Sequence, residues 1–188
     1  MGLVLKSEHL NGLKVFQPNV FEDERGFFME SYKASEFSKL GLTVEFLQDN
    51  HSRSQRGVLR GLHFQWDKPQ GKLIRVTCGT AYVVEVDIRP GSPTLGQWFA
   101  IELSESNKTI LWVPPGFANG FAAISEWVEM QYKCTAEWNS TGESAIKWND
   151  PALAIAWPLE NPIISDKDKT AQTLENWLKK PEANTLYF

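Results

Sequence analysis

The chain has 188 residues, enough for one domain with a sizeable core, and its 42% apolar and 22% charged shares are ordinary for a globular protein. Its net charge of −4 argues against general nucleic-acid binding, which leaves a basic footprint. No apolar run approaches the roughly 20 residues of a membrane span, so we expect no membrane partner. Because there is no signal-peptide core and the two cysteines, Cys78 and Cys134, are isolated, we expect a cytoplasmic protein.

Short β-segments separated by Gly, Pro, Asn and Asp dominate the chain. RGVLRGLHFQ (56–65) carries apolar residues at roughly every second position and reads as half of a hairpin. KLIRVTCGTAYVVEVDIR (72–89) predicts two alternating runs joined by a tight turn at Gly79 and Thr80. Alternation in the second run places Tyr82, Val84, Val86 and Ile88 on one face, and Val83, Glu85, Asp87 and Arg89 on the other. Further strands are predicted at 98–103, 109–114, 128–134, 144–150 and 153–158.

Helical signals are few. Ala34 to Leu40 predicts a short helix stopped by Gly41, and residues 169–180 predict a second one with Pro181 beyond its end. Many short strands without a linker or repeat indicate a single all-β domain over residues 1–188, either a sandwich or a barrel. Within it, residues 169–188 are expected to form a peripheral C-terminal helix and tail.

His63 is one of only three histidines, and it stands in a strand-like segment three residues after Arg60. Strict alternation would place these two side chains on opposite faces of the strand. Gly61 lies between them, and a glycine within a strand often marks a β-bulge that re-aims side chains. We therefore expect both side chains to face one cavity.

Other site chemistries find little support in the sequence. No H-x-H pair exists, and Asn119 in the loop-like WVPPGFANGF is a poor transition-metal ligand compared with imidazole, so no metal is expected. Glycine-rich phosphate loops are missing, and no serine or cysteine stands out as a nucleophile.

Seven ordered stretches of the chain stand out: FEDERGFFMESY (21–32), QDNHSRSQRGVLRGLHFQ (48–65), QGKLIRV (70–76), VDIRPGSPTLGQW (86–98), VPPGFANGF (113–121), KWNDPALAIAWP (147–158) and SDKD (165–168). Together they resemble the dTDP-4-dehydrorhamnose 3,5-epimerase family, over about residues 4–170. The resemblance implies a double-stranded β-helix, the cupin jelly roll, with a few short peripheral helices. It also implies cofactor-independent epimerisation at C3 and C5 of dTDP-4-dehydro-6-deoxy-D-glucose to dTDP-4-dehydro-L-rhamnose, in dTDP-L-rhamnose biosynthesis.

The resemblance also implies a role for each matching residue. His63 matches the base that removes a proton beside the ketone, and Asp168 matches its carboxylate partner. Lys72 matches the lysine that steadies the oxyanion, and Tyr132 matches the proton donor on the far face of the sugar. The residues matched to nucleotide and sugar binding are Arg25, Phe28 (with Phe21), Glu30, Gln48, Asn50, Arg60, Trp138, Glu143 and Lys167.

One departure is the GFANGF sequence, in which Asn119 stands where many members have histidine. Asparagine can still bind the substrate, but it cannot relay a proton near neutral pH. A 3-epimerase, a 3,4-ketoisomerase and a non-catalytic nucleotide-sugar binding module therefore remain as alternatives. The resemblance further implies a homodimer that exchanges N-terminal strands, so that Arg25 and Glu30 would serve the partner's site.

Overall fold

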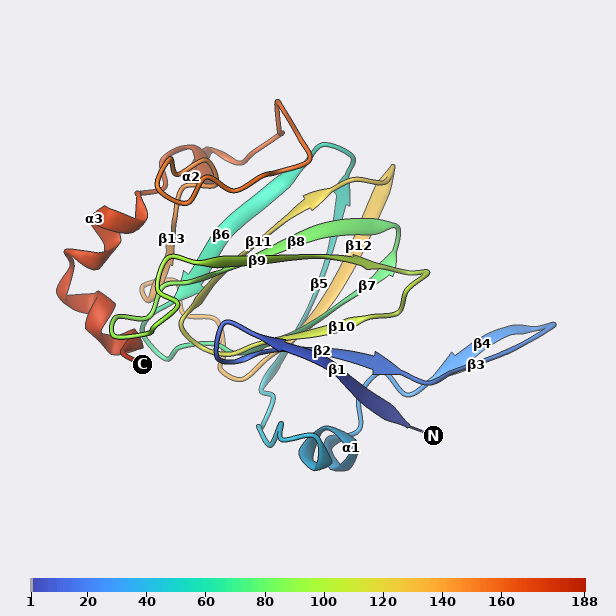
Figure 1. The fold of residues 1–188 in the computed structure, drawn as a ribbon. Helices are drawn as coiled ribbons and strands as arrows, with labels where there is room; N and C mark the ends of the chain where they lie inside the picture. The colour runs from blue at the N-terminus through green and yellow to red at the C-terminus, as the bar shows by residue number, and fades with distance from the viewer. Residues whose placement is uncertain (1) are drawn as a thin grey trace.

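Two antiparallel sheets face one another in the computed structural model, which describes residues 2–188 (Figure 1). The six-stranded sheet runs in the order β1 (Leu3–His9), β2 (Leu13–Pro18), β10 (Ile110–Val113), β7 (Lys72–Cys78), β12 (Trp127–Cys134) and β5 (Gln48–Gln55). The five-stranded sheet runs in the order β13 (Glu143–Ala145), β6 (Leu59–Gln65), β11 (Phe117–Ala123), β8 (Thr80–Asp87) and β9 (Trp98–Ser104). The expected all-β jelly-roll architecture is confirmed.

The main core lies between the two sheets, where alternate residues of both point inward. Ile74 and Met130 come from the six-stranded sheet, while Val83 and Phe121 come from the five-stranded one. This core fills one part of the interior, and the polar residues of the site occupy the same inward-facing positions farther along the strands.

Helices cover the outer faces. The five-stranded sheet is covered by α3 (Leu174–Leu178) and η1 (Pro181–Leu186), with Trp177 packed edge-on against Phe64 at 4.7 Å. The six-stranded sheet is partly covered by α1 (Ala34–Lys39), through Phe37. A fourth helix, α2 (Asp166–Lys169), lies beside β6.

A separate two-stranded hairpin, β3 (Val20–Asp23) and β4 (Gly26–Met29), extends away from the body (Figure 1). Its aromatic side chains are exposed, and Phe28 is 61% accessible. Such a row of exposed aromatics is unusual for a surface that faces only solvent.

The predicted strands at 98–103, 109–114 and 128–134 are confirmed as β9, β10 and β12, and the helix at 34–40 is confirmed as α1. The tight turn at Gly79 is also present, but the two runs it joins do not pair as a hairpin. β7 belongs to one sheet and β8 to the other, because the chain crosses between the sheets there. Gly79 has φ +75°, and a Cβ at this position would collide with the carbonyl of Trp127.

Three element predictions were wrong in whole or in part. Of the strand predicted at 144–150, only residues 144 and 145 belong to a strand, β13, and 153–158 is irregular, with Ala154 at φ +46°. This irregular segment is held by side-chain hydrogen bonds such as that from Trp157 Nε1 to the carbonyl of Trp148 (2.8 Å). The helix predicted at 169–180 is shorter than expected: it is α3 (Leu174–Leu178), which begins where the Thr173 side chain accepts a hydrogen bond from Asn176 N, while Lys169 is the last residue of α2.

Candidate active site

His63 and Asp168 form a close pair. His63 Nε2 lies 2.6 Å from Asp168 Oδ1, and the Asp168 side chain is only 2% exposed. Burial alone would raise the pKa of Asp168, but the hydrogen bond and charge of His63 hold it below its ordinary value. An ionised carboxylate can only accept, so Nε2 carries the shared proton and Nδ1 is the nitrogen left to take up another. This arrangement is that of a histidine base with an orienting acid.

The loop that carries Asp168 is tied to the strand that carries His63. The backbone N of Leu59 donates to Ile163 O (3.0 Å), and Ile163 N donates to Gly57 O (2.8 Å). Ser165 then caps α2 by accepting a hydrogen bond from Asp168 N (3.1 Å). The SDKD sequence therefore begins α2, and its second aspartate, Asp168, points back at β6.

The bulge expected at Gly61 is present. Asn119 on β11 pairs with His63 and Phe121 pairs with Arg60, so β6 holds one more residue than β11 across this interval. Gly61 has φ +139°, and a Cβ there would lie 2.6 Å from the Cα of Gly120. Since Asn119 and Phe121 lie on one face of β11, the bulge turns His63 and Arg60 toward the same interior.

Tyr132 and Lys72 lie on the opposite sheet, on neighbouring strands β12 and β7. Lys72 Nζ lies 5.8 Å from the centroid of the Tyr132 ring. Burial raises the pKa of the Tyr132 phenol, so the phenol holds its proton at neutral pH. Burial lowers the pKa of Lys72, and the nearby charge of Glu85 opposes that change. The interior thus has an imidazole on one wall and a phenol and an amine on the other.

Glu143 connects the two walls. It stands two residues from Ala145, the register partner of His63. Its charge acts on Tyr132 and Lys72, and the charge of His63 acts on it in turn, so Glu143 lies near groups of both walls. Burial would raise the pKa of Glu143, but hydrogen bonds from Lys167 and Trp138 hold it below its ordinary value.

Most of the predicted binding residues gather beside this space. Lys167 Nζ donates to Glu143 Oε2 (2.5 Å), and Trp138 Nε1 donates to the same oxygen (3.3 Å). Gln48 Oε1 accepts from Trp138 N (2.8 Å), and Gln48 Nε2 donates to Asn50 Oδ1 (3.0 Å). These contacts link residues of β5, β13 and α2 into one polar rim, with the Trp138 ring exposed.

Arg60 is held at its guanidinium by β5. Its Nε donates to Ser54 Oγ (3.0 Å), and its Nη2 donates to the carbonyl of Arg53 (3.4 Å). Its charge also acts on Tyr132. A guanidinium fixed in this way suits phosphate oxygens at the rim.

Sequence reasoning did not include Glu85 among the site residues. Asn119 Nδ2 donates to Glu85 Oε1 (2.5 Å), and both are inward-facing partners across β11 and β8. Glu85 is 0% exposed, and burial raises the pKa of its carboxyl well above the ordinary value. The signal in the sequence is a carboxylate within the apolar run YVVEV.

Arg25, Phe28 and Glu30 are not brought to His63. Arg25 pairs with its own neighbour Asp23, and Glu30 pairs with Lys33 (3.5 Å). All three lie on or just after the β3–β4 hairpin, which points away from α2 and its Asp168 in Figure 1. A single chain therefore does not bring these three residues to the place where their predicted binding roles would be needed.

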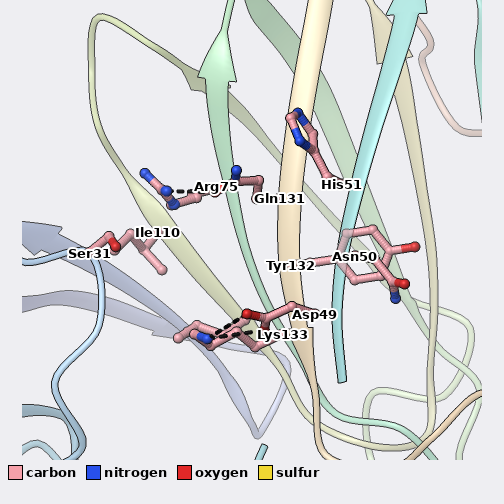
Figure 2. Close-up of a pocket in the computed structure, with 10 residues that line it drawn as sticks. Ser31, Asp49, Asn50, His51, Arg75, Ile110, Gln131, Tyr132 and Lys133 are labelled. Atoms are coloured by element: carbon pink, nitrogen blue, oxygen red, sulfur yellow. Dashed lines mark hydrogen bonds and ion pairs between the residues drawn. The ribbon is translucent and has the colours of Figure 1, made fainter. Parts of the chain in front are cut away.

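A hollow of about 270 Å³ lies on the outer side of the six-stranded sheet (Figure 2). Arg75 donates to Gln131 there (2.5 Å), and Lys133 pairs with Asp49 (3.0 Å). Figure 2 shows the Tyr132 side chain leaving β12 on the other side from Lys133, as strand alternation requires. Tyr132 therefore borders this hollow without pointing into it, and the sheet lies between the hollow and the interior that contains His63.

Within residues 2–188, no group of three or more His, Cys, Asp and Glu side chains is arranged to hold a metal ion. In the same range, no helix has the length and apolar character needed to cross a bilayer.

Comparison with known proteins gives consistent matches. A family model described as dTDP-4-dehydrorhamnose 3,5-epimerase matches residues 7–176. The dTDP-4-dehydrorhamnose 3,5-epimerase of Pseudomonas aeruginosa is 53% identical over 157 residues, covering 82% of this chain and 87% of that protein. A Legionella pneumophila epimerase crystallised with dTDP-4-keto-L-rhamnose is 45% identical, with a TM-score of 0.92 and 96% of each chain covered. A 3'-monoepimerase from Streptomyces bikiniensis, in complex with dTDP-quinovose, is 30% identical, with a TM-score of 0.83, and covers 87% of this chain and 84% of that one.

Proposed function

Because the chain belongs to the dTDP-4-dehydrorhamnose 3,5-epimerase family, we propose that His63 and Tyr132 carry out its proton transfers from opposite sides of the sugar. The activity is that of a dTDP-4-dehydrorhamnose 3,5-epimerase, an isomerase of dTDP-L-rhamnose biosynthesis, and the ligands are dTDP-sugars. The observation that carries the proposed roles is the His63–Asp168 pair, which faces Tyr132 across the interior.

The first step breaks a C–H bond next to the C4 ketone. The electron pair moves onto the ketone oxygen to give an enolate, and the proton passes to Nδ1 of His63. Asp168 stabilises the imidazolium that forms, through the 2.6 Å hydrogen bond at Nε2. Lys72, on the opposite wall, supplies positive charge to the developing oxyanion.

The second step returns a proton to the same carbon from the other face. Tyr132 is suited to this step because burial raises the pKa of its phenol and keeps it protonated until the enolate accepts the proton. Water then restores the phenol and removes the proton from His63, so no net proton is gained or lost. The same pair of groups would serve C3 and C5 in turn, after the ring reorients.

Incubation with dTDP-4-dehydro-6-deoxyglucose in D₂O, followed by NMR, tests these roles. We expect deuterium at both C3 and C5 of the product. Deuterium at C3 alone would instead indicate a 3-epimerase, and a 3-keto product would indicate a ketoisomerase. Binding of the nucleotide sugar without exchange would indicate a binding module.

We propose further that the active form is a homodimer in which the β3–β4 hairpin reaches the partner's site. Support comes from the exposed Phe28, at 61%, and from Arg25, whose side chain is 85% exposed and contacts only its neighbour Asp23 among described residues. A hairpin that carries diphosphate- and base-binding side chains away from its own body has a use if a second copy completes the site. A cytoplasmic location also stays a prediction, in keeping with two free thiols.

Complementation between two impaired variants tests this dimer, at a substrate concentration well below the KM of Arg25→Ala. Arg25→Ala and His63→Asn each damage every site of a pure homodimer. In a mixed dimer, the exchanged hairpin leaves one site with both residues intact, so mixing the unfolded chains and refolding them together should restore activity. Mixtures that recover no activity, or a monomer by light scattering, would contradict the exchange.

A further inference from the structure

A row of three polar side chains crosses the five-stranded sheet on its inner face. His63, Asn119 and Glu85 are direct register partners on the adjacent strands β6, β11 and β8. His63 is the proposed base, and Asn119 donates to Glu85 at 2.5 Å. Glu85 therefore lies in the same layer as the base, although none of the proposed steps uses it.

Glu85 differs from the other buried acids in how well its carboxyl is satisfied. Asp87 accepts from Arg89, Ser92 and Thr94, and Asp150 accepts from the backbone of Leu174 and Ala152. Glu85 is 0% exposed, yet its Oε2 has no hydrogen-bond partner within residues 2–188. Burying a carboxyl in this way is costly unless a nearby charge or ligand compensates it, so its position in the site needs a reason.

Lys72 is the cation that faces Glu85. It projects from β7 on the opposite sheet, and the two charges stabilise one another while burial disfavours both. The other titratable groups around the pair are Tyr132 and Cys134 of β12, Glu143 of β13 and His63 of β6. Burial raises the pKa of the Cys134 thiol, which leaves Glu85 and Glu143 as the carboxyl groups that act on Lys72. Burial raises the pKa of Glu85 and the charge of Lys72 opposes that change, so the ionised form of Glu85 depends on Lys72.

Glu85 also holds the side-chain amide of Asn119. A neutral amide brings no charge to this layer, and its Nδ2 is committed to Glu85. The amide orientation is fixed by that bond, because a carboxylate accepts and the amide NH₂ donates. Asn119 then has its carbonyl oxygen left to accept a hydrogen bond from a sugar hydroxyl.

We propose that Glu85 is a positioning residue of the epimerase reaction, which acts as the counter-charge that keeps Lys72 an ammonium and fixes the amide of Asn119. Because this inference rests on the proposed role of Lys72, Glu85 acts through that residue and does not itself touch the reacting atoms. The Lys72 charge is needed when the C4 oxygen becomes an oxyanion, and a buried amine without a counter-charge loses its proton readily.

Glu85→Gln tests the inference, because it keeps the shape of the side chain and its acceptor for Asn119 but removes the charge. We expect kcat to fall roughly tenfold to hundredfold, as when part of an oxyanion-stabilising charge is lost, with dTDP affinity unchanged. The alkaline limb of the kcat/KM profile should move to lower pH, since the charge that raises the pKa of Lys72 is gone. Glu129→Gln, on the outer side of β12, is the matched control and should leave the profile unmoved.

Two further variants distinguish this role from a structural one. Glu85→Asp keeps the charge and should retain the alkaline limb, even if its shorter side chain lowers kcat. In a Lys72→Met background, Glu85→Gln should cost little more, because the residue through which it acts is absent.

Equal losses in both backgrounds, or a Glu85→Gln profile that matches the Glu129→Gln control, would overturn the inference. Deuterium incorporation at C3 and C5 by the wild-type enzyme is measured alongside. If the wild type incorporates none, the proposed function fails. If it does and Glu85→Gln behaves like the control, only the role of Glu85 fails.

Discussion

The inner walls of the two sheets and the β3–β4 hairpin carry the two halves of the predicted site, and they are built in opposite ways. On the inner walls, His63, Lys72 and Tyr132 are set by strand register, and Asp168 is buried against His63. On the hairpin, Arg25 and Phe28 are exposed and contact little beyond their neighbours. The proposed proton transfer thus depends on groups that one chain positions, whereas the proposed nucleotide contacts depend on groups that one chain leaves free.

This difference has an energetic reason. Proton transfer requires groups held within hydrogen-bond reach of the reacting atoms, and the rigid pleat of a sheet provides such positions. Nucleotide binding can use side chains that become ordered only when the nucleotide binds, because charge-assisted hydrogen bonds to phosphate offset the cost of fixing exposed side chains. Substitutions on the inner walls should therefore change kcat, and substitutions on the hairpin should change KM.

His63→Asn should give the largest effect. We expect deuterium exchange and turnover to fall by about 10³–10⁴-fold, near the upper range for loss of a general base. Affinity for dTDP, measured by calorimetry, should stay within about twofold, because the nucleotide contacts lie elsewhere. His51→Asn is a suitable control, since His51 is exposed on the same sheet as Tyr132 and pairs with Glu129. Substantial deuterium exchange by His63→Asn would contradict the assignment of His63 as the base.

Asp168→Asn should rank second. The amide can donate to His63 as well as accept, so the tautomer with a free Nδ1 is no longer enforced and the imidazolium loses its counter-charge. We expect a loss of roughly 10²-fold in kcat with KM little changed. Asp166→Asn, two residues earlier on α2 and exposed, should have near wild-type kinetics. Similar kinetics for the two variants would contradict the orienting role of Asp168.

Arg25→Ala tests the other side of the comparison. Loss of one guanidinium from a diphosphate should raise KM by roughly tenfold to hundredfold, while kcat changes little. The melting temperature should not move, because the side chain is exposed and its ion pair with Asp23 is worth little in water. Arg56→Ala, another exposed arginine, serves as the control. A fall in kcat with unchanged KM would place Arg25 in the chemistry instead.

Local features of the sequence predicted most of the inner walls correctly. Gly61 between Arg60 and His63 predicted a bulge because only a locally inserted residue brings both side chains to one face, and the register shows that insertion. The alternation of VEMQYKC likewise placed Tyr132 on the inner face with Met130, which packs in the core between the sheets. In both cases the information lies within a few residues of the site.

Features that depend on distant contacts were not predictable in the same way. Alternation identified the strands on both sides of Gly79, but it carries no information on which strand each one pairs with, so the crossing between sheets was missed. The apolar LAIAWP (153–158) predicts a strand although the segment is irregular, because burial against the outer face of the sheet selects apolar residues in either backbone conformation. Glu85 was overlooked because its significance comes from Lys72 and Asn119, both far from it in sequence.

The smallest expected effect concerns acid stability and again separates a buried group from an exposed one. The pKa of Asp168 is held down in the folded state, mainly by His63 against the opposing effect of burial. Its stabilising contribution is therefore present above the pKa of an unfolded aspartate and is lost as pH falls through the lower folded pKa.

Urea unfolding at pH 7 should show Asp168→Asn less stable than wild type by about 1.5–3 kcal/mol, the usual range for a hydrogen bond to a charged group. The gap should narrow steadily below about pH 4, where the wild-type carboxylate begins to bind a proton in the unfolded chain. Asp166→Asn, which removes an exposed ion pair, should differ little from wild type at either pH. A gap that stays constant down to the acid transition would mean that the Asp168 carboxylate is not what the folded state stabilises.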